Sequence, residues 1–242
     1  MSTDTLVILV VAIVAGAVAA VTGFGIGSLL TPVLALSVDT RVAVAAVSIP
    51  HVVGTAIRFW LLQGRVDRRV LWSFGLTSAA GGLAGAALYS IASNRWLNLV
   101  FGTLLLFVAV SELTGLSHRL RFRGWVAWLA GSLSGLLGGL VGNQGGIRSA
   151  ALLGFDLPKD TFVGTATAIA LFVDGARVPV YLITQRADIE QMSGWIGVAV
   201  AGVVIGTLAG SRVRTRVPEI WFRRVLAVIL MLLGVAMLWR TT

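Results

Sequence analysis

The sequence predicts an all-α integral membrane protein made of two inverted repeats, each a glycine-broken helical hairpin followed by three transmembrane helices. Three observations support this fold class. Of the 242 residues, 57% are hydrophobic and 12% are charged, and the mean hydropathy is +0.93, far above that of average soluble domains. Apolar stretches follow one another from end to end with only short polar breaks between them. The two halves of the chain also align with each other.

Ten apolar stretches are expected to form helices. They run from Leu6 to Val21, Ser28 to Val38, Val42 to Leu62, Val70 to Ile91, Trp96 to Leu116, Trp125 to Val141, Ile147 to Phe155, Phe162 to Ile183, Met192 to Val213 and Ile220 to Trp239. Six of them reach the roughly 20 residues that cross the hydrocarbon core comfortably. The other four form two pairs, each joined by a glycine-rich break, at Thr22 to Gly27 and at Gly142 to Gly146. Because a glycine costs up to about 1 kcal/mol inside a helix, we expect neither break to be ordinary helix.

The first stretch is expected to belong to the membrane domain. Met1 to Ala20 is apolar, lacks a basic n-region and runs on through the first break into further apolar sequence. These features predict a retained helix and not a cleaved signal peptide.

The alignment of the halves predicts an internal duplication within one integrated membrane domain, with residues 1–123 as the first repeat and 124–242 as the second. It pairs Gly23 with Gly142, Gly27 with Gly146, Arg58 with Arg177, Gly81 with Gly202, Gly85 with Gly206 and Trp96 with Trp221. Small loop insertions account for an offset that grows along the chain. The alternative is an accidental similarity between two stretches rich in Leu, Val, Ala and Gly.

The net charge is +9, but the arginines that produce it cluster between the apolar stretches, so the charge does not indicate a nucleic-acid partner. Arginines cluster at Arg65, Arg68 and Arg69, at Arg119, Arg121 and Arg123, and at Arg212, Arg214 and Arg216. Such clusters mark cytoplasmic loops, whereas Arg95 and Arg186 are expected outside. This assignment requires each glycine-broken pair to return to the side from which it came, so the halves have opposite orientations and both termini lie outside. Inverted repeats with broken helices are typical of secondary transporters that bind substrate near the midplane.

Several motifs resemble those of a known family. A glycine-rich break leads into a short helix, the loop Gly64-Arg65-Val66-Asp67 follows the next helix, and a small-residue helix then carries Gly81, Gly82 and Gly85. The same layout recurs in the second half. Over nearly its full length the chain resembles the TauE/SafE family of sulfite and organosulfonate exporters. The resemblance implies a multi-pass transporter of the cell inner membrane that exports a small sulfur-containing anion.

Two arginines lie inside apolar helices at matching places of the repeats. A cation at a helix centre costs about 2.5 to 3.5 kcal/mol on insertion scales, so Arg58 and Arg177 need a reason to be there. Because the planar guanidinium group binds sulfite or sulfonate oxygens in a bidentate way, we expect the pair to bind the substrate across the pseudo-twofold axis. The alternative is that both side chains snorkel to an interface.

The glycine breaks offer the second part of an anion site. Where the helices restart, near Ser28 and Ile147, unpaired N–H groups and the positive end of the helix dipole point into the gap. The glycines that would let an oxyanion approach are Gly23, Gly25, Gly27, Gly145 and Gly146. Family members commonly have glycine and apolar residues in the second break, where this chain has Asn143, Gln144 and, just inside the following helix, Arg148. These three are candidate ligands, and the alternatives are helix capping for the amides and a bond to a carbonyl for Arg148.

Two further ionisable residues lie inside apolar stretches. Asp174 stands three residues before Arg177, so it either forms an i,i+3 ion pair or acts as a coupling carboxylate whose protonation frees the arginine. His51 follows Pro50, and it is either a titrating group near the site or a hydrogen-bond partner of a neighbouring helix.

Small residues on two helices predict close helix contacts. They are Gly81, Gly82 and Gly85 and the matching Gly202, Gly206 and Gly210. Such spacings suit contact within one subunit or across a homodimer.

Other classes of function are less well supported. The chain has no cysteine and only two histidines, His51 and His118, so we expect no metal site and no cofactor. An enzyme would need a nucleophile with a base or a metal cluster, and neither a His-x-x-x-His nor a Ser/His/Asp grouping is visible in the sequence. The expected partners are a small anionic substrate and the lipid bilayer. A passive anion channel and a non-transporting membrane scaffold are the alternatives.

Overall fold

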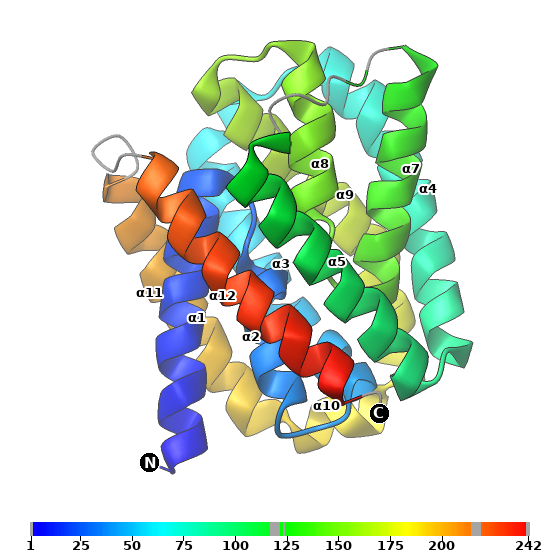
Figure 1. Ribbon diagram of the computed structural model, residues 1–242, viewed down its shortest axis with the longest axis vertical. Helices are drawn as coiled ribbons and strands as arrows, with labels where there is room; N and C mark the ends of the chain where they lie inside the picture. The colour runs from blue at the N-terminus through cyan, green and yellow to red at the C-terminus, as the bar shows by residue number, and fades with distance from the viewer. Residues whose placement is uncertain (1, 117–121, 123, 214–218, 241–242) are drawn as a thin grey trace.

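The computed structural model describes residues 2–116, 122, 124–213 and 219–240, and within them the protein is all-helical (Figure 1). The α-helices are α1 (Thr3–Thr22), α2 (Ile26–Ala35), α3 (Thr40–Leu62), α4 (Arg68–Ile91), α5 (Asn94–Thr114), α7 (Trp125–Val141), α8 (Gly145–Leu152), α9 (Lys159–Thr184), α10 (Arg186–Gln191), α11 (Ser193–Val213) and α12 (Glu219–Trp239). Short 3-10 turns, Gln63–Arg65 and Leu153–Phe155, follow α3 and α8.

Six of the described helices are long and apolar enough to cross a membrane, namely α1, α3 with its 3-10 turn, α4, α5, α9 and α11. Large apolar side chains such as Trp60, Ile91 and Ile183 are exposed, as is expected of helices that face lipid. The chain is therefore an all-helical, multi-pass membrane protein, as predicted. These six helices include five of the six stretches that were predicted to be long enough to cross, together with α1, which spans 20 residues. The remaining predicted stretch, Ile220 to Trp239, lies in α12, where the side chains are described only from Arg224 onward.

α1 and α7 each end at a glycine in the left-handed conformation. The φ angle is 84° at Gly23 and 73° at Gly142. The N–H of each glycine donates to the carbonyl four residues earlier, at 2.9 Å to Ala19 and 3.0 Å to Gly138. This is the helix termination that glycine favours, because it has no Cβ to clash at positive φ.

Both breaks are shorter than predicted. Only residues 23–25 and 142–144 are non-helical, because α2 begins at Ile26 and α8 at Gly145. The expectation that Gly27, Gly145 and Gly146 lie outside helices was wrong. These glycines serve close packing instead, since a Cβ on Gly145 would collide with Phe24 and a Cβ on Gly146 with Val108 of α5.

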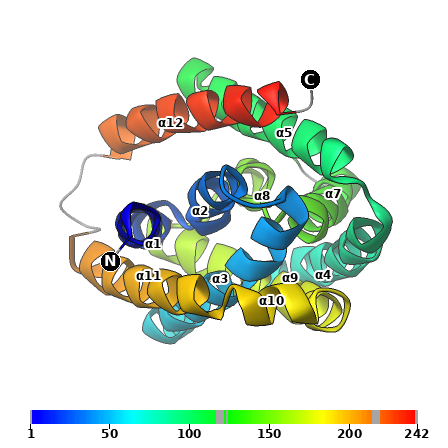
Figure 2. The same ribbon diagram turned by 90° about the horizontal axis from the view of Figure 1, so that it is seen from below.

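The helices form layers around these breaks. Figure 2 shows α2 and α8 in the middle, with α5 and α12 on one side and α3, α9, α10 and α11 on the other. α2 packs on both α3 and α12, and α8 packs on α7 and α9. The short helices that follow the breaks are therefore enclosed by the longer ones.

The turn between α3 and α4 is hydrogen-bonded to α9. Asp67 caps α4, because its Oδ1 accepts from Val70 N at 2.9 Å, and its own N–H donates to Thr165 Oγ1 of α9 at 2.9 Å. Arg65 is exposed in this turn, Arg68 and Arg69 are exposed at the start of α4, and Arg212 is exposed at the end of α11. Some residues singled out in the sequence lie outside the described part of the chain, namely His118, Arg119, Arg121, Arg123, Arg214, Arg216 and the side chain of Trp221.

The predicted small-residue stripes pack within the chain. α11 lies against α1 and α4 against α7, and these two contacts correspond under the alignment of the halves. A Cβ on Gly206 would collide with the carbonyl oxygen of Ile13, and one on Gly85 with that of Leu136. Because these glycines are used inside the subunit, they lend no support to a homodimer.

Replacing Gly206 with alanine tests this packing. The new Cβ would press on the backbone of α1, which yields less easily than a flexible side chain, so we expect a loss of about 1 to 3 kcal/mol in stability. The melting temperature in detergent should fall by several degrees. Gly197→Ala on the same helix is the matched control, since its Cβ would meet open space. Equal melting temperatures for the two variants would contradict this account of the contact.

Candidate functional site

The two breaks lie against each other in the middle layer. Ser28 Oγ, in the first turn of α2, donates to Asn143 Oδ1 in the second break at 2.9 Å. A Cβ on Gly27 would collide with the carbonyl oxygen of Gly142, so this approach requires glycine. The positive N-terminal ends of α2 and α8 are therefore close together, and residues from both halves surround them.

Arg58 and Arg177 are each bound to the end of the helix that stops at the break in their own half. Arg58 Nη1 donates to the carbonyl of Ala19 at 2.6 Å, and Arg177 Nη1 donates to that of Gly138 at 2.7 Å. Each arginine thereby stabilises the negative C-terminal end of α1 or α7. The two side chains are 2% and 1% exposed, so neither snorkels to an interface.

The second contact of each arginine differs between the halves. Arg58 Nη2 donates to Thr55 Oγ1 at 3.0 Å. The corresponding place before Arg177 is occupied by Asp174, whose Oδ1 accepts from Nε at 2.9 Å and lies 2.9 Å from Nη2. The predicted i,i+3 ion pair is therefore present, and it balances the charge of Arg177. A threonine leaves the charge of Arg58 unbalanced.

Asp174 also binds His51. Its Oδ2 lies 2.8 Å from His51 Nδ1, so His51 makes the predicted hydrogen bond to a neighbouring helix, here α9. The sequence did not predict this pairing, because the two residues are far apart in the chain and no spacing rule joins them. His51, Asp174 and Arg177 form one connected polar chain.

Arg148 reaches from α8 to the first break. Its Nη2 donates to the carbonyl of Gly23 at 3.2 Å, so the predicted bond to a carbonyl is present. Its Nε and Nη1 are buried and make no hydrogen bond within the protein. The charges of Arg148 and Arg58 lie close enough to act on each other, and two cations that repel each other inside a protein favour an anion between them.

Asn143 and Gln144 do not cap α8. Gln144 precedes the helix without a side-chain capping bond, and Asn143 Oδ1 is taken by Ser28. The amide nitrogens of both residues are buried without a hydrogen-bond partner in the protein. Ser134 Oγ donates to the carbonyl of Gln144 at 3.0 Å, which fixes the backbone of the break while the two amide nitrogens stay unpaired.

Around the breaks, three guanidinium groups face one carboxylate. Among the described residues, the buried nitrogen donors without a partner are Arg58 Nε, Arg148 Nε, Arg148 Nη1, Asn143 Nδ2 and Gln144 Nε2. Native proteins satisfy the large majority of buried polar groups, and an uncompensated buried charge is strongly destabilising. An oxyanion supplies negative charge and several acceptor oxygens at once, so it fits this set of donors.

Not every predicted residue joins this cluster. Gly25 packs against Val18, and Gly146 packs against Val108, so both serve helix packing and not the polar site. Conversely, the hydroxyls of Thr31 and Ser149 are buried without partners and were not predicted. The position of these polar residues inside the short apolar helices α2 and α8 is the sequence feature from which they could have been predicted.

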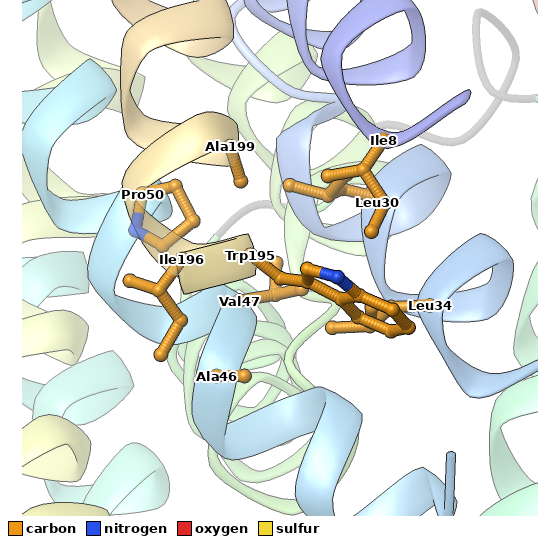
Figure 3. Close-up of a pocket in the computed structure, with 9 residues that line it drawn as sticks. All are labelled: Ile8, Leu30, Leu34, Ala46, Val47, Pro50, Trp195, Ile196 and Ala199. Atoms are coloured by element: carbon orange, nitrogen blue, oxygen red, sulfur yellow. The ribbon is translucent and has the colours of Figure 1, made fainter. Parts of the chain in front are cut away.

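An apolar pocket lies between α1, α2, α3 and α11 (Figure 3). It is lined by Ile8, Leu30, Leu34, Ala46, Val47, Pro50, Trp195, Ile196 and Ala199. These side chains offer no cationic donors for an anion. Among the described residues, no three His, Asp or Glu side chains gather to hold a metal ion.

The chain matches a model of a known protein family. A family model described as Sulfite exporter TauE/SafE matches residues 8–237, which include both breaks and every residue of the polar cluster. The comparisons with curated proteins and with solved structures gave no match.

Proposed function

Because the chain belongs to the TauE/SafE family of sulfite exporters, we propose that it is a secondary transporter that exports a small sulfur-containing anion, such as sulfite or an organosulfonate, across the cell inner membrane. The main support is the excess of buried positive charge at the breaks. A bound oxyanion would compensate this charge and accept hydrogen bonds from the unpaired donors.

The anion in this proposal lies between the arginines of the two halves. Arg58 and Arg148 are its principal ligands, because neither forms an ion pair with a carboxylate of the described residues and both have N–H groups without partners. The charge of Arg177 is already balanced by its ion pair with Asp174, so its contribution to anion binding is smaller. Asn143 and Gln144 add neutral donors, which fix the orientation of the oxyanion without adding charge.

The two halves are proposed to be inverted repeats, 1–123 and 124–242, whose broken helices form re-entrant hairpins. Three features support this. The bonds from Arg58 to Ala19 and from Arg177 to Gly138 occupy corresponding positions, and the contacts of α1 with α11 and of α7 with α4 correspond as well. In Figure 1, the start of α1, the end of α12 and α10 also lie at the same end of the bundle, as a topology with both termini outside requires.

The proposed anion site predicts that Arg58→Lys and Arg148→Lys both weaken the binding of sulfite. Lysine keeps the charge but loses the planar fork and its fixed donors, so each variant should bind at least tenfold more weakly, which corresponds to about 1.4 kcal/mol. Calorimetry on the purified protein measures this change. Arg186→Lys is the control, because that side chain is 81% exposed and pairs with Glu190. Wild-type affinity in the folded Arg58 and Arg148 variants would remove both residues from the site.

The inverted topology predicts which residues an impermeant thiol reagent reaches in intact cells. The chain has no cysteine of its own, so single cysteines can be placed at Ser2, Arg68 and Arg95, which are all exposed. Ser2→Cys and Arg95→Cys should be labelled from outside, and Arg68→Cys only after the membrane is opened, because arginine-rich loops stay in the cytoplasm. Labelling of Arg68→Cys in intact cells together with protection of Arg95→Cys would reverse the orientation.

A further inference from the structure

One ionisable side chain at the site has no role in holding the anion. His51 lies on α3 beside the meeting point of the breaks, and a Cβ built on Gly27 would lie 3.9 Å from its Cδ2. Its side chain is 10% exposed, whereas those of Asp174 and Arg177 are 1% exposed. Within the chain His51–Asp174–Arg177, the histidine is therefore the most accessible member.

The bond to Asp174 fixes which nitrogen of His51 takes up a proton. A neutral imidazole that faces a carboxylate donates its N–H to it, so Nδ1 carries the hydrogen that points at Asp174 Oδ2, 2.8 Å away. Nε2 is then the basic nitrogen. A proton that binds at Nε2 produces an imidazolium, which the same carboxylate holds in place.

The charges around His51 make its protonation depend on the anion. Asp174 and Arg177 act on it from α9 and Arg58 acts on it from its own helix, and Arg148 lies across the break on α8. α2 carries no ionisable residue, and the described part of α11 carries only Arg212, exposed at its far end. The guanidinium groups of Arg58 and Arg177 oppose protonation of His51, and the carboxylate of Asp174 favours it. A bound anion cancels part of the positive charge of the guanidinium groups and therefore favours protonation.

We propose that His51 is a proton-binding site and that the transporter binds one proton together with each anion. This inference rests on the proposed function, since it needs an anion between the arginines. Linkage is reciprocal, so a proton on His51 must raise the affinity for the anion by the same factor by which the anion raises the affinity for the proton. On binding, the proton enters from solvent onto Nε2 and no other bond changes.

The test is a proton count during the binding of methanesulfonate. This anion keeps the same charge between about pH 5 and 8, the range in which histidine titrates, so any proton taken up belongs to the protein. Calorimetry in two buffers with different heats of ionisation gives the number of protons bound per anion. We expect the wild-type protein to take up as much as one proton and to bind up to tenfold more tightly for each pH unit that the solution is lowered. His51→Gln keeps a hydrogen-bond donor for Asp174, and it should bind with no proton uptake and a flat pH profile.

His118→Gln is the matched control, because His118 is the other histidine of the chain, and it should behave as the wild type does. Release of protons by the wild type, no net uptake, or an unchanged pH profile in His51→Gln or in the shorter His51→Asn would overturn the inference. The wild-type proton count decides the matter even where a variant fails to fold. Failure of both methanesulfonate and sulfite to bind at any pH would instead overturn the proposed function.

Discussion

A guanidinium group buried in a membrane protein needs partners inside the protein, and here Arg58 and Arg177 find them at the ends of broken helices. Their Nη1 groups donate to the carbonyls of Ala19 and Gly138, the same carbonyls that accept the N–H of the terminating glycines. One interaction in each half therefore stabilises the end of a helix and retains a cation in the apolar interior. The restarting helices α2 and α8 then meet beside these cations, where Ser28 binds Asn143.

The halves share this framework but differ in charge. Thr55 accepts from Arg58 at the place where Asp174 accepts from Arg177, and Arg148 adds a cation in the second half only, since the corresponding residue of the first half is apolar. The hydrogen bonds that end α1 and α7 are thus alike, while the charges beside them differ. The second half supplies the carboxylate of Asp174, and the first half supplies His51, which binds it. Asp174 therefore connects α3 with α9, and it pairs with both Arg177 and His51.

The helices and their ends were predictable from the sequence, whereas the contacts between distant residues were not, for physical reasons. Long apolar runs predicted the helices, because about 20 residues must cross the hydrocarbon core, and Gly23 and Gly142 predicted the ends of α1 and α7. The pairing of His51 with Asp174 depends on how α3 crosses α9, which no local pattern encodes. The first-turn glycines were misassigned because Gly145 is needed against Phe24, a tertiary contact that is invisible in the spacing.

An oxyanion is proposed to occupy the junction of the two breaks. Diffraction from crystals soaked in selenite, the selenium analogue of sulfite, tests it directly, because the anomalous signal of selenium locates the anion without assumptions about its partners. The account predicts one strong peak at the breaks, with selenite oxygens about 2.7 to 3.2 Å from nitrogens of Arg58 and Arg148. Selenium bound only at exposed arginines such as Arg65 or Arg186, with none at the junction, would contradict it.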